Sequence, residues 1–147
     1  MISKIALAVS SIALFALLSG CAAQNAENPR FVDLGNGVCQ DTRTGSMWQM
    51  ERTKTIKSIE EARKYAANLK LGGHADWRLP NVYELYDLIN LKDLHVASGC
   101  AMRLDGNYWS DKHGGEGTVG AWEIGDQCDP SRRYAKATQG YVRAIRP

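Results

Sequence analysis

Residues 58–89 read SIEEARKYAANLKLGGHADWRLPNVYELYDLI, and this stretch decides the fold because it carries the signals of two helices. Ser58 precedes Glu61 by three residues, which is the spacing of a capping box that satisfies two free N–H groups at a helix start. Apolar residues then recur at helical spacing as far as Leu69. Gly72-Gly73 predicts the end of this helix, since glycine readily adopts the left-handed conformation of a helix cap.

The second helix of this stretch is predicted to begin at Asn81. Asn81 is a favourable N-cap residue, and Glu84 follows it three residues later. Four apolar residues have the spacing of one buried helix face: Val82, Leu85, Leu88 and Ile89.

Outward from the helices, the sequence predicts short strands separated by turns. Three come before them, at Phe31–Leu34, Val38–Asp41 and Met47–Gln49. Two aromatic strands, Tyr108–Ser110 and Ala121–Glu123, lie in a glycine-rich region, and Tyr141–Arg146 alternates as a closing strand. We expect the closing strand to pair with the N-terminal strand. The prediction is an α+β domain with two helices, a small twisted antiparallel sheet and long loops.

The N-terminus has the features of an export signal. Lys4 precedes the uncharged stretch Ile5–Leu18, which is shorter than the roughly 20 residues that span a bilayer core. Leu18-Ser19-Gly20-Cys21 resembles a bacterial lipobox, in which the cysteine is acylated after cleavage. We therefore expect a signal peptide over residues 1–20, a lipid-anchored tether over 21–30 and one domain over 31–147. The absence of an aspartate after Cys21 favours the outer membrane of the cell envelope.

Disulfides persist in exported proteins, and three cysteines remain once Cys21 carries the lipid. One disulfide and one free thiol are then expected, with three possible pairings. We favour Cys100–Cys128, because both lie in the loop-rich region, and expect Cys39 to be a small buried residue of a strand.

Composition and spacing argue against several kinds of chemistry. The chain of 147 residues has 18 basic and 16 acidic residues, so its net charge of +2 supplies no strong field for nucleic acid. The three histidines lack the spacing of metal ligands, and Ser110 has no histidine and acid partner indicated by spacing. We expect no enzyme activity, no metal site and no cofactor, and a structural role for Asp76-Trp77-Arg78.

The candidate ligand-binding residues form a basic and aromatic cluster near the C-terminus: Arg132, Arg133, Tyr134 and Lys136. Arginine can bind sulfate or carboxylate through two parallel hydrogen bonds, and tyrosine can stack on a sugar face. We expect these residues to lie on a loop. Arg143 and Arg146 are expected on opposite faces of the closing strand, with Arg143 as a structural ion-pair partner.

Several motifs resemble an exported bacterial domain family, that of the C-terminal domain of the Legionella collagen-like protein (Lcl). Residues 36–49, NGVCQDTRTGSMWQ, are similar to its opening NGTVTDTRTGLMWQ, and residues 71–81, LGGHADWRLPN, match its central signature LGG-x-x-DWRLP-T. Tyr108–Ser110 and Tyr141–Arg146 match its closing motifs YWSS and YVRCVR. The resemblance implies a variant of the C-type-lectin-like fold and an affinity for sulfated glycosaminoglycans.

The resemblance extends to the group of formylglycine-generating enzymes, but the chain lacks their closely spaced cysteine pair. It also lacks the tripeptides with which calcium-dependent lectins bind sugars. We therefore expect a lipid-anchored envelope protein that binds a glycan or matrix polymer. The alternative is a structural envelope lipoprotein that binds another envelope protein, and a formylglycine-generating type of enzyme is the least favoured hypothesis.

Overall fold

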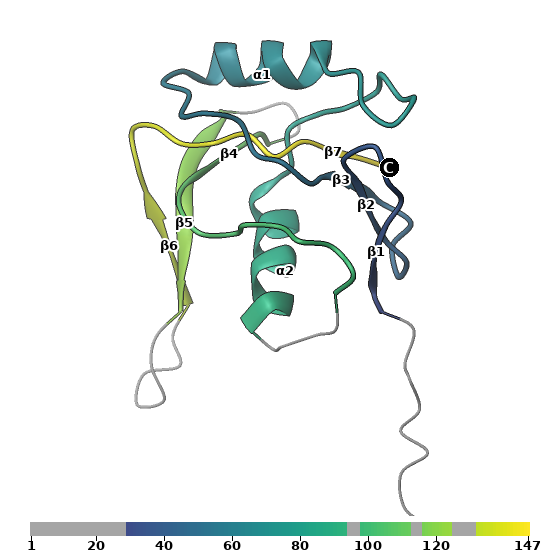
Figure 1. Cartoon of the computed structure of the whole chain (residues 1–147). Helices are drawn as coiled ribbons and strands as arrows, with labels where there is room; N and C mark the ends of the chain where they lie inside the picture. The colour runs from purple at the N-terminus through teal and green to yellow at the C-terminus, as the bar shows by residue number, and fades with distance from the viewer. Residues whose placement is uncertain (1–28, 94–97, 113–115, 125–131) are drawn as a thin grey trace, which may run out of the picture.

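The computed structural model describes residues 29–93, 98–112, 116–124 and 132–147, with side chains given for all of these except 91–93 and 124. Two helices and two small antiparallel sheets make up the described fold, which is α+β as predicted. Figure 1 shows helix α2 standing between the two sheets, with α1 lying across one end of them. Cys21, Cys128, His95 and His113 lie outside the described residues.

Helix α1 (Ile59–Asn68) begins as the capping box predicts, since Ser58 Oγ accepts a hydrogen bond of 3.2 Å from the Glu61 N–H. It ends at Asn68, earlier than the predicted end at Gly72-Gly73. The two glycines instead have positive φ and form a tight turn, in which Leu71 and His74 exchange backbone hydrogen bonds. The glycine pair therefore reverses the chain after the helix has ended.

Helix α2 (Val82–Asp93) also has the predicted start. The Asn81 Oδ1 accepts from the N–H groups of Tyr83 and Glu84, and Glu84 Oε2 accepts from the Asn81 N–H in return. Arg78 adds two hydrogen bonds to the Glu84 carboxylate, so the positive charge of Arg78 stabilises the start of α2. Trp77 is 3% exposed, which confirms the structural role expected for it.

The first sheet has the order β1-β2-β3-β7 and contains both ends of the domain. Its strands are β1 (Phe31–Asp33), β2 (Val38–Asp41), β3 (Met47–Gln49) and β7 (Ile145–Arg146). The closing strand pairs with β3, with Trp48 opposite Ile145, and not with β1 as expected. It is also shorter than predicted, because Tyr141 bonds with Asn107 and Trp109, outside this sheet.

The second sheet has the order β4-β5-β6, with β4 (Tyr108–Ser110), β5 (Thr118–Ile124) and β6 (Arg132–Lys136). Two sheets thus replace the single sheet that was predicted, and the C-terminal segment crosses from the second to the first (Figure 1). The basic residues expected on a loop form the edge strand β6.

The core has two parts. One lies against α1 and is built from these buried residues: Val38, Ile56, Ala62, Ala66, Trp77, Leu79, Trp109, Val119, Val142 and Ala144. The other lies against α2 and contains Phe31, Cys39, Trp48, Leu85, Leu88, Cys100, Tyr108 and Ile145. In the described part of the chain, neither helix is long and apolar enough to cross a membrane.

The disulfide joins Cys39 of β2 to Cys100, so the favoured Cys100–Cys128 pairing is wrong. The two cysteines are 61 residues apart in sequence, and their Cα atoms are 6.0 Å apart. Gly99 N–H donates to the Phe31 carbonyl at 2.8 Å, which brings the segment of Cys100 alongside the first hairpin. Cys39 is fully buried as expected, but as half of the crosslink.

Candidate binding surfaces

Strand β6 divides the predicted basic cluster between two faces. Side chains alternate along a strand, so Arg132, Tyr134 and Lys136 share one face and Arg133 lies on the other. Arg133 forms a 2.5 Å ion pair with Glu123 across the sheet, in which both side chains are at least half exposed. Three of the four predicted residues are thus brought together, and the fourth is not.

The face of Arg132 is lined by aromatic rings from three elements. Tyr134 lies opposite Trp122 of β5, with ring centroids 5.5 Å apart, and Trp122 contacts Tyr86 of α2 edge to face at 4.8 Å. Trp122 Nε1 also donates to the Val82 carbonyl at 3.1 Å, which fixes the indole against the helix. The row of rings therefore joins the second sheet to α2.

Arg132 completes this row. Its guanidinium lies over the Tyr86 ring, 5.3 Å from the centroid, and donates to the Tyr86 hydroxyl at 2.5 Å and to the Asn90 side-chain oxygen. Tyr86 and Asn90 were not predicted from the sequence as members of the surface. Their spacing from Val82, at four and eight residues, was the available signal, since it places all three on one helix face.

Tyr134 is the partly buried member of this surface. Gly120 lies diagonally across from it, and the absence of a side chain there leaves room for the Tyr134 ring. Burial raises the pKa of the Tyr134 hydroxyl, and the neighbouring Ser110 and Thr118 side chains oppose the rise only in part. These neighbours lie close to the hydroxyl, although neither meets hydrogen-bond geometry. The hydroxyl therefore stays protonated at neutral pH.

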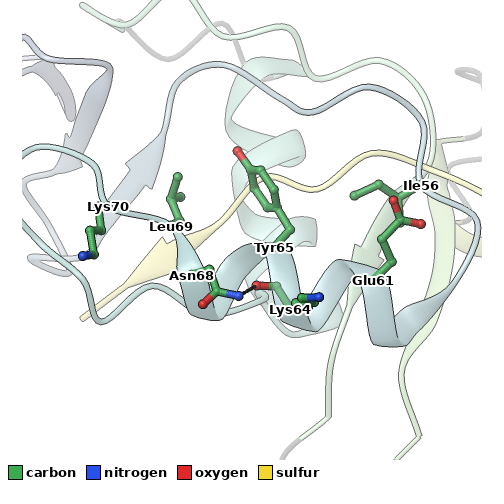
Figure 2. A pocket seen from close by; sticks show the side chains of 7 residues that line it. All are labelled: Ile56, Glu61, Lys64, Tyr65, Asn68, Leu69 and Lys70. Carbon is green, nitrogen blue, oxygen red and sulfur yellow. Dashed lines mark hydrogen bonds between the residues drawn. The ribbon is translucent and has the colours of Figure 1, made fainter.

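A second candidate surface is a groove of about 420 Å³ along α1. Figure 2 shows Tyr65 in its middle, Ile56 and Glu61 at one end and Lys70 at the other. Ile56 is buried, and Leu69 and Tyr65 are partly buried against the core. The sequence pattern predicts an apolar helix face here but no groove.

Arg143 is a buried cation on the closing segment, with 1% of its surface exposed. Its guanidinium donates to the carbonyls of Gln49, Met50 and Arg103, so backbone oxygens take the place of the ion pair that was expected. Burial lowers the pKa of Arg143, and the charge of Arg52 acts in the same direction. These bonds hold the closing segment to the segments of Gln49 and Arg103.

Two ion pairs stabilise the first sheet. Arg30 binds both oxygens of Asp41 at 2.6 and 2.8 Å, and Arg146 does the same to Asp76 at 2.7 and 3.0 Å. Burial acts to raise the pKa of Asp41, but the hydrogen bonds and charge of Arg30 hold it below its usual value. Arg146 and Arg143 thus have separate partners, as strand alternation predicted.

The described residues contain no group of three or more histidine, cysteine, aspartate or glutamate side chains placed to hold a metal ion. The Arg132 face offers cations, an amide and aromatic rings, and the groove offers apolar side chains with lysines and the Glu61 carboxylate at its rim.

The fold and these surfaces define a small α+β domain with exposed polar surfaces and a disulfide in its core. The family model of the Lcl C-terminal domain matches residues 37–146, and the chain belongs to this family. This membership agrees with an exported protein, either associated with the cell envelope or secreted. No curated protein and no solved structure matches the chain.

Proposed function

We propose that the protein is a lipid-anchored binding module of the cell envelope that recognises a polyanionic glycan through the Arg132 face of β6. One observation carries the proposal: Arg132, Tyr134 and Lys136 lie on one face beside the rings of Trp122 and Tyr86. Cations next to aromatic rings are suited to a sulfated or carboxylated sugar, because the cation binds the anion and the ring packs on the sugar. The resemblance to the Lcl family implies an affinity for sulfated glycosaminoglycans, and the proposal follows it in the choice of ligand class.

The proposed fold is a variant of the C-type-lectin-like fold. Two helices, small antiparallel sheets and the placement of both domain ends in one sheet support it. Such a scaffold places both ends of the domain in the first sheet, and the exposed side chains of Arg132 and Lys136 lie on the edge strand of the second sheet.

The test of the glycan site is salt elution from a heparin column. Arg132→Gln with Lys136→Gln removes two charges from the proposed face, and glutamine can still hydrogen-bond to Tyr86 and Asn90. We expect this variant to elute at a clearly lower salt concentration than the parent chain. It has two fewer cations to bind heparin, and salt screens the remaining ionic attraction over about 8 Å at physiological salt.

The matched control is Arg43→Gln with Arg133→Gln, which also removes two exposed charges but none from this face. We expect it to elute close to the parent chain. Equal elution of both variants, with circular dichroism showing both folded, would contradict a site on the Arg132 face and leave only a general effect of net charge.

The anchor has its own test at Cys21. Cys21→Ser is expected to abolish labelling with palmitate and to release the protein from the outer-membrane fraction, because a lipid chain holds a protein to a bilayer through its buried methylenes. Persistent labelling or membrane retention of this variant would contradict lipidation at Cys21. Neither result depends on the ligand of β6.

A further inference from the structure

We propose that the groove along α1 is a docking site for a polypeptide segment that carries one apolar anchor side chain between an acidic and a basic residue. The acidic residue lies toward Lys70, and the basic residue lies toward Glu61. This surface and this partner are separate from the glycan face of β6, so the inference does not rest on the proposed function.

The floor of the groove is apolar and held in place by the core. Ile56 is 7% exposed, and the side chains of Leu69 and Tyr65 pack on the buried cluster that includes Ala62 and Ala66. The groove has a volume of about 420 Å³ and is an open surface depression, so it suits one anchoring side chain of a segment that lies on the surface. An apolar centre surrounded by a polar rim is the usual arrangement of protein interfaces.

The rim carries charges that the described fold does not use. Lys64, Lys70 and Glu61 are exposed, and they form no ion pair with any described residue. Arg63 on the same helix, by contrast, binds Asp111 through two hydrogen bonds of 2.7 and 2.8 Å. The helix thus uses one cation within the fold and leaves two others beside the groove.

These charges are separated along the groove. In Figure 2, Glu61 stands at the Ile56 end and Lys70 at the opposite end, with Lys64 on the helix between them. A bound segment with one basic and one acidic residue therefore has one favoured direction, because the reverse direction places like charges together. This polarity favours a peptide over a uniformly anionic polymer, which Glu61 would repel.

The hydroxyl end of Tyr65 is held by a buried side chain of the core. Its hydroxyl accepts a 2.7 Å bond from Gln49 Nε2, and the Gln49 amide is fixed in that orientation because its Oε1 accepts from the Ala144 N–H at 3.1 Å. These bonds hold the Tyr65 ring in a fixed position as part of the groove floor.

The experiment is an NMR titration of the full chain, labelled with ¹⁵N and held in a mild detergent. The probe is the peptide acetyl-Lys-Gly-Leu-Gly-Asp-amide, and the comparison peptide has serine in place of leucine. We expect saturable shifts of the amide signals of residues 56–70 with a millimolar Kd for the leucine peptide, and no saturation for the serine peptide.

Lys64→Glu with Lys70→Glu is expected to weaken binding about threefold to tenfold, as the loss and reversal of exposed ionic contacts predict. The control Lys54→Glu changes an exposed lysine outside the groove lining and is expected to leave the Kd unchanged. All three substitutions are on exposed side chains, and superposition of the unbound spectra shows that the fold is retained.

Three results would overturn the proposal. They are the absence of shifts in residues 56–70 at 10 mM peptide, an equal Kd for the double variant and the parent, or saturable shifts in the groove with D-glucuronate and none with the peptide. The last result would assign the groove to an acidic sugar.

Discussion

Removal of the Cys39–Cys100 disulfide tests the most consequential long-range contact of the fold. The crosslink closes a loop with a sequence separation of 61, and chain entropy alone gives about 4 kcal/mol of stabilisation for a loop of this length. Both cysteines are buried, so replacing them with alanine also leaves a small cavity that costs about 1 kcal/mol. We expect Cys39→Ala with Cys100→Ala to lower the free energy of unfolding by about 4 to 5 kcal/mol.

Urea denaturation followed by circular dichroism measures this change. With an m-value of about 2 kcal/mol/M, the midpoint should fall by about 2 M. Because a typical domain has only about 5–15 kcal/mol of total stability, the variant should remain folded only marginally. Dithiothreitol should lower the midpoint of the parent chain and leave that of the double variant unchanged.

Peptide mapping without reductant supplies the control for the pairing. Cys128→Ala should retain the linked peptide that contains Cys39 and Cys100. A linked peptide that contains Cys128 in the parent chain, or an unchanged midpoint for Cys39→Ala with Cys100→Ala, would refute the assignment.

Two further predictions concern buried charge. Arg143→Ala should lower the free energy of unfolding, measured by urea denaturation, by about 3 to 5 kcal/mol, because three backbone carbonyls lose their donor. The control Arg103→Ala changes an exposed side chain and should alter this free energy by less than about 1 kcal/mol. Equal effects of the two substitutions would contradict the role of Arg143. The pKa of Asp41 is lowered in the folded chain, so its stabilisation is present above the unfolded value of about 3.9 and is lost as the pH falls through the folded value. The free energy of unfolding should therefore decrease on acidification from about pH 5 to pH 2. The Asp41→Asn variant should show a shallower decrease. An identical pH profile for the parent chain and this variant would contradict the ion pair with Arg30.

Features set by neighbouring residues could be predicted from the sequence. Both helix starts follow from capping residues within three positions, and the structure has these hydrogen bonds at Ser58 and Asn81. The strands of the first hairpin likewise have the predicted positions, because alternation and turn residues act locally. The end of α1 was misjudged because Gly72-Gly73 serves equally well as a helix cap and as a separate turn.

Features set by distant residues could not be predicted in the same way. The partner of β7 and the partner of Cys100 depend on how segments far apart in sequence come together, and spacing alone carries no signal of this. The basic cluster shows the same limit. Its residue types were visible, but only the strand conformation of β6 shows that Arg133 lies on the other face from Arg132.

The Cys39–Cys100 crosslink also determines how the domain carries tension. Pulling on the chain before Arg30 loads the Arg30–Asp41 pair and then the hydrogen bonds that hold β1 to β2 and to Gly99. When the pull reaches Cys39, the disulfide passes the load directly to Cys100. If a ligand is held at β6 and the tether is strained, the covalent path of the force bypasses residues 40–99, which contain both helices and the groove.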